Sequence, residues 1–531
     1  MRMKTVFLTF IILMIFSAKN YSQEVKLDQK MYWMHLDPQD DQIMGLSTNK
    51  AYAMLQGKKS KTVIVGVIDS GIDYEHEDIK DVMWTNEDEI AGNGKDDDKN
   101  GYIDDIHGWN FIGGKGFNIE NETLEMTRIY KEGRDKFKNK NLDDVSKEDK
   151  AEFLQFKKVE SKFFDETERA KSESKGLASA LANFEYVEGV LKEEFKLDTI
   201  IIDDVIAMKT ENSVTQSCID FLVRLKTNNI DKKAFLDAKK HYDSKINFQL
   251  NPDFNPRKEM GDDVYNGNDK NYGNNDVRGP GSDHGTHVAG IIGAKRNNNI
   301  GIDGIADNVK IISVRAVPDG DERDKDIANA IRYCVDNGAR VINMSFGKAY
   351  SPQKKMVDEA VQYAMEKGVL LIHAAGNDAE NNDVSDHFPS QTYLDGKTKA
   401  NIWLTVGASS LNTGADLPGN FSNYGKKSVD FFAPGVDIYS LNPNNRYEFQ
   451  SGTSMACPAT TGVAALIMSY FPDLTALEVK DILIASVYNV SKLKVNAPSE
   501  GENAKLVKFS KLCTTGGVVN AYKAVQLAKE K

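Results

Sequence analysis

The segment 65–73 reads Val-Gly-Val-Ile-Asp-Ser-Gly-Ile-Asp, a continuous apolar run that ends at Asp69 and a glycine turn. Such a run is typical of a strand that is buried on both faces. Strand patterns then alternate with helical patterns, which predicts an α/β fold: a mainly parallel sheet with helices on both faces. The predicted elements cover 62–68, 311–317, 326–337, 341–344, 356–367 and 369–374, with a further helix that begins at His284.

The stretch 117–250 has a different composition. It contains no proline and only three glycines, and apolar residues such as Phe153, Phe156 and Phe163 recur at helical spacing. We therefore predict an all-helical insertion within the α/β chain. Its apolar stripes need a partner surface, which is either one another, the rest of the chain or another protein; packing within the chain is the ordinary case.

The N-terminus has the pattern of a secretory signal, because Arg2 and Lys4 precede a short apolar run over 5–18 and polar residues follow at once. The run is too short to span a bilayer comfortably, so a membrane anchor or a buried helix is the lesser alternative. We predict a signal peptide over 1–22, cleaved between Ala18 and Gln23, and an exported protein, secreted or periplasmic, with no membrane attachment afterwards. The lead-in at 23–47 is too short to fold as a separate domain, and a helix is predicted over 48–55.

The charge balance is acidic, with 67 Lys and Arg against 79 Asp and Glu and a formal net charge of −12. This balance argues against nucleic acid or an anionic membrane as a partner. The cysteines are far apart and have no Cys-x-x-Cys spacing, so they indicate neither a zinc cluster nor a disulfide framework. They are Cys218, Cys334, Cys457 and Cys513.

Ser454 lies in the run Gly-Thr-Ser-Met-Ala at 452–456, directly before an apolar helical pattern. A serine alcohol becomes a good nucleophile only when a base, an orienting carboxylate and donors to the oxyanion surround it. The chain offers Asp69, His284 at the start of a helix, and Asn377 after Ala-Ala-Gly. Each of these alone is more often a cap or a turn residue.

Together, in the chain order Asp, His, Asn, Ser and without a Gly-x-Ser-x-Gly elbow, these four motifs resemble the subtilisin-like serine peptidases. The resemblance covers about 48–116 and 251–527, and we assign 48–116 and 251–531 to the two parts of a subtilisin-like catalytic domain. It implies that Ser454 is the nucleophile and that His284 is the general base. Asp69 would orient His284, and Asn377 would donate to the oxyanion. Such chemistry requires no cofactor.

The resemblance also implies that an extended peptide substrate binds between two segments of small residues. Family members commonly have a second glycine where this chain has Lys348, so we expect altered pairing at that edge and a preference for acidic substrate side chains nearby. We expect the primary specificity pocket to reach 388–390 and to accept large apolar side chains. The two segments consist of Ser345, Phe346 and Gly347, and of Ala374, Ala375 and Gly376.

The loop 96–105 concentrates oxygen ligands around a glycine turn, as calcium loops do. We predict a structural Ca²⁺ site; its candidate ligands are Asp96, Asp98, Asn100 and Asp104. The twelfth position of this loop is His107 instead of Glu, so a regular EF-hand is not predicted, and a solvated acidic turn is the alternative. The spacing His284-x-x-His287 also admits zinc, but no third ligand accompanies it.

The function that these observations favour is an exported serine endopeptidase that hydrolyses polypeptides through an acyl-enzyme. One alternative is a catalytically silent binding protein that holds a protein partner with the helical insertion. A serine esterase or amidase would share the chemistry and is disfavoured only by the resemblance.

Overall fold

The computed structural model describes residues 27–228, 232–499, 501 and 504–531. The predicted signal peptide lies outside these residues. The chain divides into two compact units, one of Met126–Asn255 and one that contains Pro256–Lys531 with the preceding residues up to Glu125. None of the described helices is long and apolar enough to cross a membrane.

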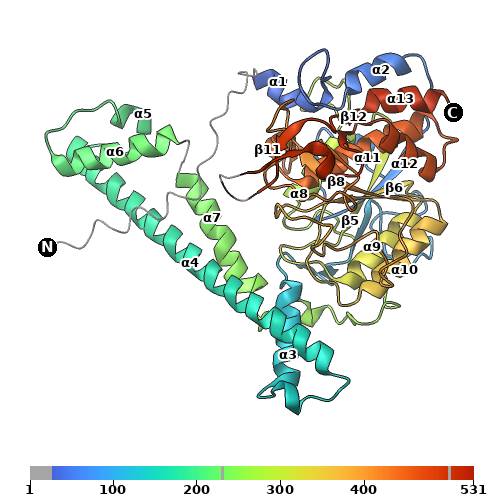
Figure 1. Cartoon of the computed structure of the whole chain (residues 1–531), viewed down its shortest axis with the longest axis horizontal. Helices are drawn as coiled ribbons and strands as arrows, with labels where there is room; N and C mark the ends of the chain where they lie inside the picture. The colour runs from blue at the N-terminus through green and yellow to red at the C-terminus, as the bar shows by residue number, and fades with distance from the viewer. Residues whose placement is uncertain (1–26, 229–231, 500, 502–503) are drawn as a thin grey trace. The chain divides into compact units, whose positions relative to one another are not determined.

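The larger unit is built on a sheet of nine strands among its described residues (Figure 1). Neighbouring strands are parallel except for the pair β12 and β15 at one edge. The mainly parallel sheet predicted from the alternating pattern is therefore confirmed. The spatial order is β12 (Tyr488–Asn489), β15 (Gly517–Val518), β9 (Phe431–Pro434), β8 (Trp403–Ser409), β7 (Leu370–Ala374), β6 (Val341–Met344), β1 (Val63–Asp69), β5 (Val309–Arg315) and β2 (Gly108–Asn110).

Successive side chains of β1 point to opposite faces of the sheet, and each face is covered by helices. Val65 and Val67 belong to a core cluster that includes α8 (Asp283–Gly293) and α11 (Thr453–Tyr470). Ile68 belongs to a second cluster that includes α9 (Asp324–Asp336) and α10 (Lys354–Glu366), which lie together in Figure 1. The layers predicted from the sequence are thus present. Further elements are α1 (Leu27–Tyr32), α12 (Ala476–Ala485), and the hairpins β3–β4 (Gly113–Gly114, Phe117–Asn118), β10–β11 (Ile438–Asn442, Arg446–Gln450) and β13–β14 (Lys494–Asn496, Leu506–Lys508).

The N-terminal lead-in is part of this unit's core. The predicted helix is α2 (Thr48–Leu55), and it packs beside α13 (Ala521–Lys529) (Figure 1). Trp33 is only 1% exposed, and its Nε1 donates to the carbonyl of Asp437 at 3.0 Å. The backbone N–H of Ala521 donates to the carbonyl of Leu46 at 2.8 Å. The segment around Trp33 therefore helps to build the core of the larger unit.

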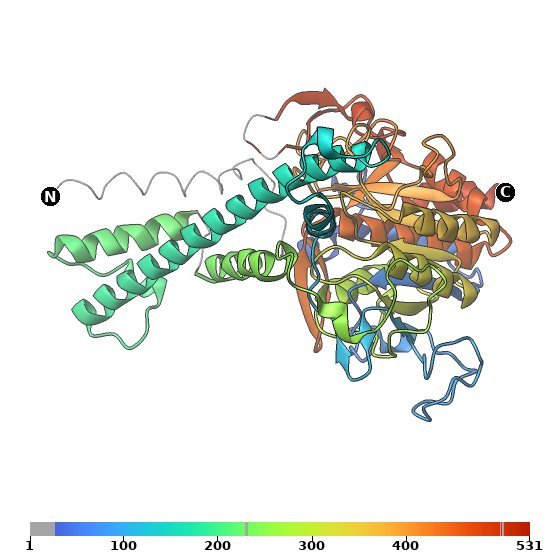
Figure 2. The ribbon, with the colours of Figure 1, turned by 90° about the horizontal axis from the view of Figure 1, so that it is seen from below.

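The described residues of the smaller unit, Met126–Asn255, are helical apart from the loops that connect the helices (Figure 2). The unit begins later than the predicted start at 117, because Phe117–Asn118 forms a strand of the larger unit. Its apolar stripes pack on one another: Phe153 and Phe156 join Phe137 in one cluster, and Leu191 joins Leu222 in another. Its helices are α3 (Glu125–Phe137, whose first residue belongs to the larger unit), α4 (Lys150–Phe195), α5 (Ile202–Val205), α6 (Ser213–Thr227) and α7 (Lys232–Ser244).

Candidate active site

Asp69 is the last residue of β1, at the carboxyl edge of the sheet where α/β folds place their sites. Its side chain is buried. Oδ1 accepts the backbone N–H of Ser70 at 2.7 Å and lies 2.7 Å from Nδ1 of His284. Oδ2 has no hydrogen-bond partner among the described residues. The carboxylate is therefore held at one oxygen, against the imidazole.

His284 stands in the first turn of α8, and the glycine after it allows the close approach to Asp69. A Cβ on Gly285 would lie 2.1 Å from the carbonyl oxygen of Gly71, so no other residue fits there without a shift. Burial of the His284 ring favours its neutral form, but the carboxylate of Asp69 outweighs burial and raises the pKa of His284 above its usual value. Because Nδ1 is hydrogen-bonded to Asp69, Nε2 is the ring nitrogen that can accept a proton.

Ser454 lies in the first turn of α11 and is partly exposed. Its Oγ donates to the carbonyl of Ser345 at 3.2 Å, and its own carbonyl accepts from Ser345 Oγ at 2.9 Å. In the described part of the chain no hydrogen bond joins Ser454 to His284. Such bonds are often loose in unliganded enzymes and tighten when substrate is bound.

Asn377 follows β7 and has an exposed side chain. Its Oδ1 accepts the backbone N–H of Thr453 at 2.9 Å and the Thr453 hydroxyl at 3.0 Å. A backbone N–H can only donate, so the amide atom that faces it must be the oxygen. This contact fixes the amide orientation, and Nδ2 makes no hydrogen bond to another described residue. Thr453 belongs to the run 452–456 that was singled out for Ser454, but no contact with Asn377 was predicted for it.

The two segments predicted to hold substrate lie on neighbouring strands, after β6 and at the end of β7. Ser345, Phe346, Ala374 and Ala375 are buried, while Gly347 is exposed and Gly376 is half-buried. These segments therefore present glycine and backbone atoms to solvent more than side chains.

The expectation that Lys348 favours acidic substrate side chains is wrong. Its side chain is 2% exposed, and Nζ pairs with Glu125 at 2.8 Å and with Asp324 at 2.9 Å. Its backbone N–H and carbonyl both bond to Phe388, at 2.9 Å each. The positive charge of Lys348 is paired with these two carboxylates inside the protein, as a buried ammonium group requires. It is therefore not available to a substrate.

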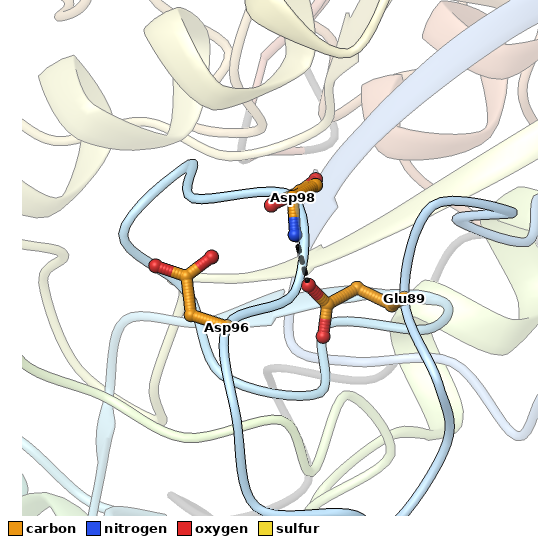
Figure 3. Close-up of side chains that lie close together, drawn as sticks. All are labelled: Glu89, Asp96 and Asp98. Carbon is orange, nitrogen blue, oxygen red and sulfur yellow. Dashed lines mark hydrogen bonds between the residues drawn. The ribbon is translucent and has the colours of Figure 1, made fainter.

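The acidic loop brings together Glu89, Asp96 and Asp98, whose carboxylate oxygens lie within 4.8 Å of one another (Figure 3). Asp96 and Asp98 were predicted as ligands, but Glu89 was not, because it precedes the loop and belongs to no motif. Asp104 lies outside this group, and its oxygens accept the N–H groups of residues 93 and 94. Asn100 Nδ2 donates to Asp98 at 2.9 Å. A set made only of oxygen atoms fits a hard cation such as Ca²⁺.

Two other predictions concern the residues around the site. His287 hydrogen-bonds the carbonyl oxygens of Ile438 at 3.1 Å and Glu448 at 3.2 Å, and burial lowers the pKa of His287 to about 3. It is therefore a neutral core residue and not a partner of His284 in a metal site. All four cysteines are free and buried. Burial raises the pKa of Cys457 to about 12, so its thiol is inert despite its position near Ser454.

Comparisons with known proteins place the chain in one family. A family model described as the subtilase family matches residues 60–506. The thermophilic serine proteinase of Bacillus sp. (strain AK1) is 43% identical over 189 residues, which are 35% of this chain and 43% of that protein. Subtilisin DY of Bacillus licheniformis is 34% identical over 211 residues, or 40% of this chain and 72% of that protein.

A solved structure of proteases from Pseudoalteromonas arctica matches with a TM-score of 0.39 and 28% identity, over 49% of this chain and 80% of that chain. The chain spans less than half the length of the Bacillus AK1 proteinase. The family model, in contrast, covers most of the present sequence. The chain belongs to the subtilase family.

Proposed function

We propose that this protein is a serine endopeptidase that cleaves polypeptides through an acyl-enzyme. The observation that carries the proposal is the 2.7 Å contact between His284 Nδ1 and Asp69 Oδ1, in a chain of the subtilase family. This contact prepares Nε2 of His284 to act as a base near neutral pH.

In the proposed reaction, Ser454 Oγ turns away from the carbonyl of Ser345 and attacks the carbonyl carbon of the substrate, while His284 Nε2 takes its proton. Asp69 stabilises the imidazolium. Negative charge develops on the substrate oxygen, where Asn377 Nδ2 and the backbone N–H of Ser454 donate hydrogen bonds. The C–N bond then breaks, and His284 returns the proton to the leaving amine.

Water then hydrolyses the acyl-enzyme, and the proton transfers between Ser454 and His284 run in the opposite direction. His284 removes a proton from a water molecule, and the resulting hydroxide attacks the acyl carbon. The bond to Ser454 Oγ breaks, and Oγ regains its proton from His284. The products are the two peptide fragments, and no cofactor takes part in these steps.

The proposal includes export, supported by the basic and apolar pattern of residues 1–22. After removal of the signal peptide, the protein would act in the periplasm or outside the cell without membrane attachment. It also includes a structural Ca²⁺ held by Glu89, Asp96 and Asp98. The ion would neutralise the carboxylates of the loop and fix its conformation.

A second function is proposed for the helical unit. Large apolar side chains remain exposed on it: Tyr186 is 59% and Phe164 is 50% exposed. This surface supports binding of a protein partner by Met126–Asn255, with or without catalysis in the other unit.

Labelling with a fluorophosphonate tests the catalytic proposal. We expect the wild type to be labelled and Ser454→Ala to be unlabelled, with equal folding by circular dichroism. A folded but unlabelled wild type would instead support the binding protein. Turnover of casein compared with small esters distinguishes a peptidase from an esterase, and a pull-down with and without residues 126–255 tests the partner.

A further inference from the structure

His387 lies between the two segments proposed to hold the substrate. If a Cβ were added to Gly347, it would stand 2.5 Å from both Cε1 and Nε2 of His387. On Gly376 it would stand 3.0 Å from the same Cε1. The edge of the imidazole therefore packs beside both glycines and fills the room that a side chain on Gly347 would need, while at Gly376 the nearest atom to the added Cβ is Asn423 Nδ2 at 2.4 Å.

These two glycines flank the residue that would be attacked. Gly376 directly precedes Asn377, the proposed donor to the substrate oxygen. Gly347 follows Ser345, whose carbonyl contacts Ser454 Oγ at 3.2 Å. The resemblance places the primary specificity pocket between these two segments and residues 388–390, so the side chain of the attacked residue would enter between Gly347 and Gly376, toward His387.

The ring of His387 packs against further aromatic rings. It packs on His373 with ring centroids 5.3 Å apart, and His373 packs on Trp403 at 5.5 Å. His373 is fixed in turn, because its Nε2 hydrogen-bonds the carbonyl of Phe346 at 2.8 Å. Behind His387 stands a row of packed rings rather than free space.

The backbone beside His387 is equally fixed. Phe388 exchanges two hydrogen bonds of 2.9 Å with Lys348, and Lys348 Nζ is anchored by Glu125 and Asp324. The buried charge of Lys348 thus secures the backbone segment on which Gly347 lies.

The chemistry of His387 suits a packing role. Burial lowers its pKa, although Asp378 and Glu380 act in the opposite sense, so the ring is neutral at neutral pH. Nε2 is buried and has no hydrogen-bond partner among the described residues. A buried polar atom without a partner is costly, so its presence at this position requires a physical reason.

We propose that His387 determines the specificity of the peptidase by closing the space between Gly347 and Gly376, so that the attacked residue must have a short side chain such as that of alanine. This inference rests on the proposed peptidase function. It replaces the expectation that this position accepts large apolar side chains. The signal in the sequence was His387 itself, directly before Phe-Pro-Ser at 388–390.

The test uses two peptide p-nitroanilides that differ only in their last residue, alanine or phenylalanine. We expect wild-type kcat/KM to be higher for alanine. His387→Ala should shift the ratio toward phenylalanine by about 10-fold or more, the scale on which pocket size discriminates substrates. His387→Phe should keep the wild-type preference, because its ring retains the bulk. His241→Ala, an exposed histidine of α7, is the matched control and should leave the ratio unchanged.

Fluorophosphonate titration gives the concentration of active enzyme, so partial misfolding of a variant does not alter the ratio. If His387→Ala does not fold, cleavage sites of the wild type on a denatured proteome still decide the proposal. A preference for phenylalanine or leucine in the wild type, or an unchanged ratio in His387→Ala, would overturn it. A folded protein that takes no label and cleaves neither substrate refutes the peptidase itself, which is a separate outcome.

Discussion

Nδ1 of His284 lies 2.7 Å from Oδ1 of Asp69, although 215 positions separate the two residues along the chain. The contact forms because β1 ends at Asp69 and because Gly285 allows α8 to approach the turn after that strand. The helical insertion, Met126–Asn255, lies within those 215 positions of the chain.

The pH dependence of activity should follow His284. Protonated His284 cannot accept the proton of Ser454, so kcat/KM should rise as pH increases through the raised pKa of His284. In Asp69→Asn the carboxylate that raises this pKa is absent and burial remains, so the midpoint should move to lower pH. The rate should also fall by about 10⁴, because the wrong tautomer is favoured. A pH profile of kcat/KM for both proteins checks this, and an unchanged midpoint contradicts it.

Loss of the Asn377 amide should weaken the transition state more than substrate binding. We expect Asn377→Ala to lower kcat by about 10² to 10³ with little change in KM, as for removal of one oxyanion donor. Thr453→Val is the graded control. It removes the hydroxyl bond to Asn377 Oδ1 and the 3.1 Å bond that the hydroxyl accepts from the Gly376 N–H, but it keeps the backbone bond to Asn377, so a loss of about five-fold is expected. Steady-state kinetics make the measurement, and an unchanged kcat in Thr453→Val would disprove the orienting role of the Thr453 hydroxyl.

Calcium should stabilise the acidic loop. With Ca²⁺ at about a hundred times its dissociation constant, the free energy of unfolding should rise by about 2.7 kcal/mol over that in EDTA. Glu89→Gln should abolish most of this difference, because Glu89 is one of the three grouped carboxylates. Glu87→Gln removes an exposed charge two positions away and should keep the difference. Thermal melts with and without EDTA make the measurement; melts that coincide for the wild type would exclude the site.

The lead-in should remain in the active enzyme, because it contributes to the core. Trp33→Ala should reduce the free energy of unfolding by about 3 to 5 kcal/mol, the range for large buried aromatic residues. Tyr32→Ala, next to it but 39% exposed, should cost less than about 1 kcal/mol. Denaturant unfolding tests the pair. N-terminal sequencing of the fluorophosphonate-labelled enzyme should find residues 33–61 present, and labelled enzyme without them would refute the prediction.

Local patterns predicted most of the fold and only part of the site. The apolar run ending at Asp69, the alternation of strands and helices, and the helix over 48–55 are all local features, and the structure contains each of them. The contact between Asp69 and His284 was expected only through the resemblance to a family. Glu89 and Thr453 escaped prediction because their neighbours in sequence give no sign of the carboxylates or the amide that they meet in space.

The sequence by itself determined that this is an α/β protein of the subtilase type with a helical insertion, because hydrophobic periodicity and short motifs are properties of adjacent residues. The tertiary structure decided what Lys348 and His387 do. Lys348, which was expected to contact acidic substrate side chains, is buried and paired with Glu125 and Asp324. His387, which belongs to none of the motifs, packs beside Gly347 and Gly376. Burial and side-chain packing depend on segments that are distant in the chain. Only the folded molecule therefore shows which charged groups form buried ion pairs and how much space remains for a substrate.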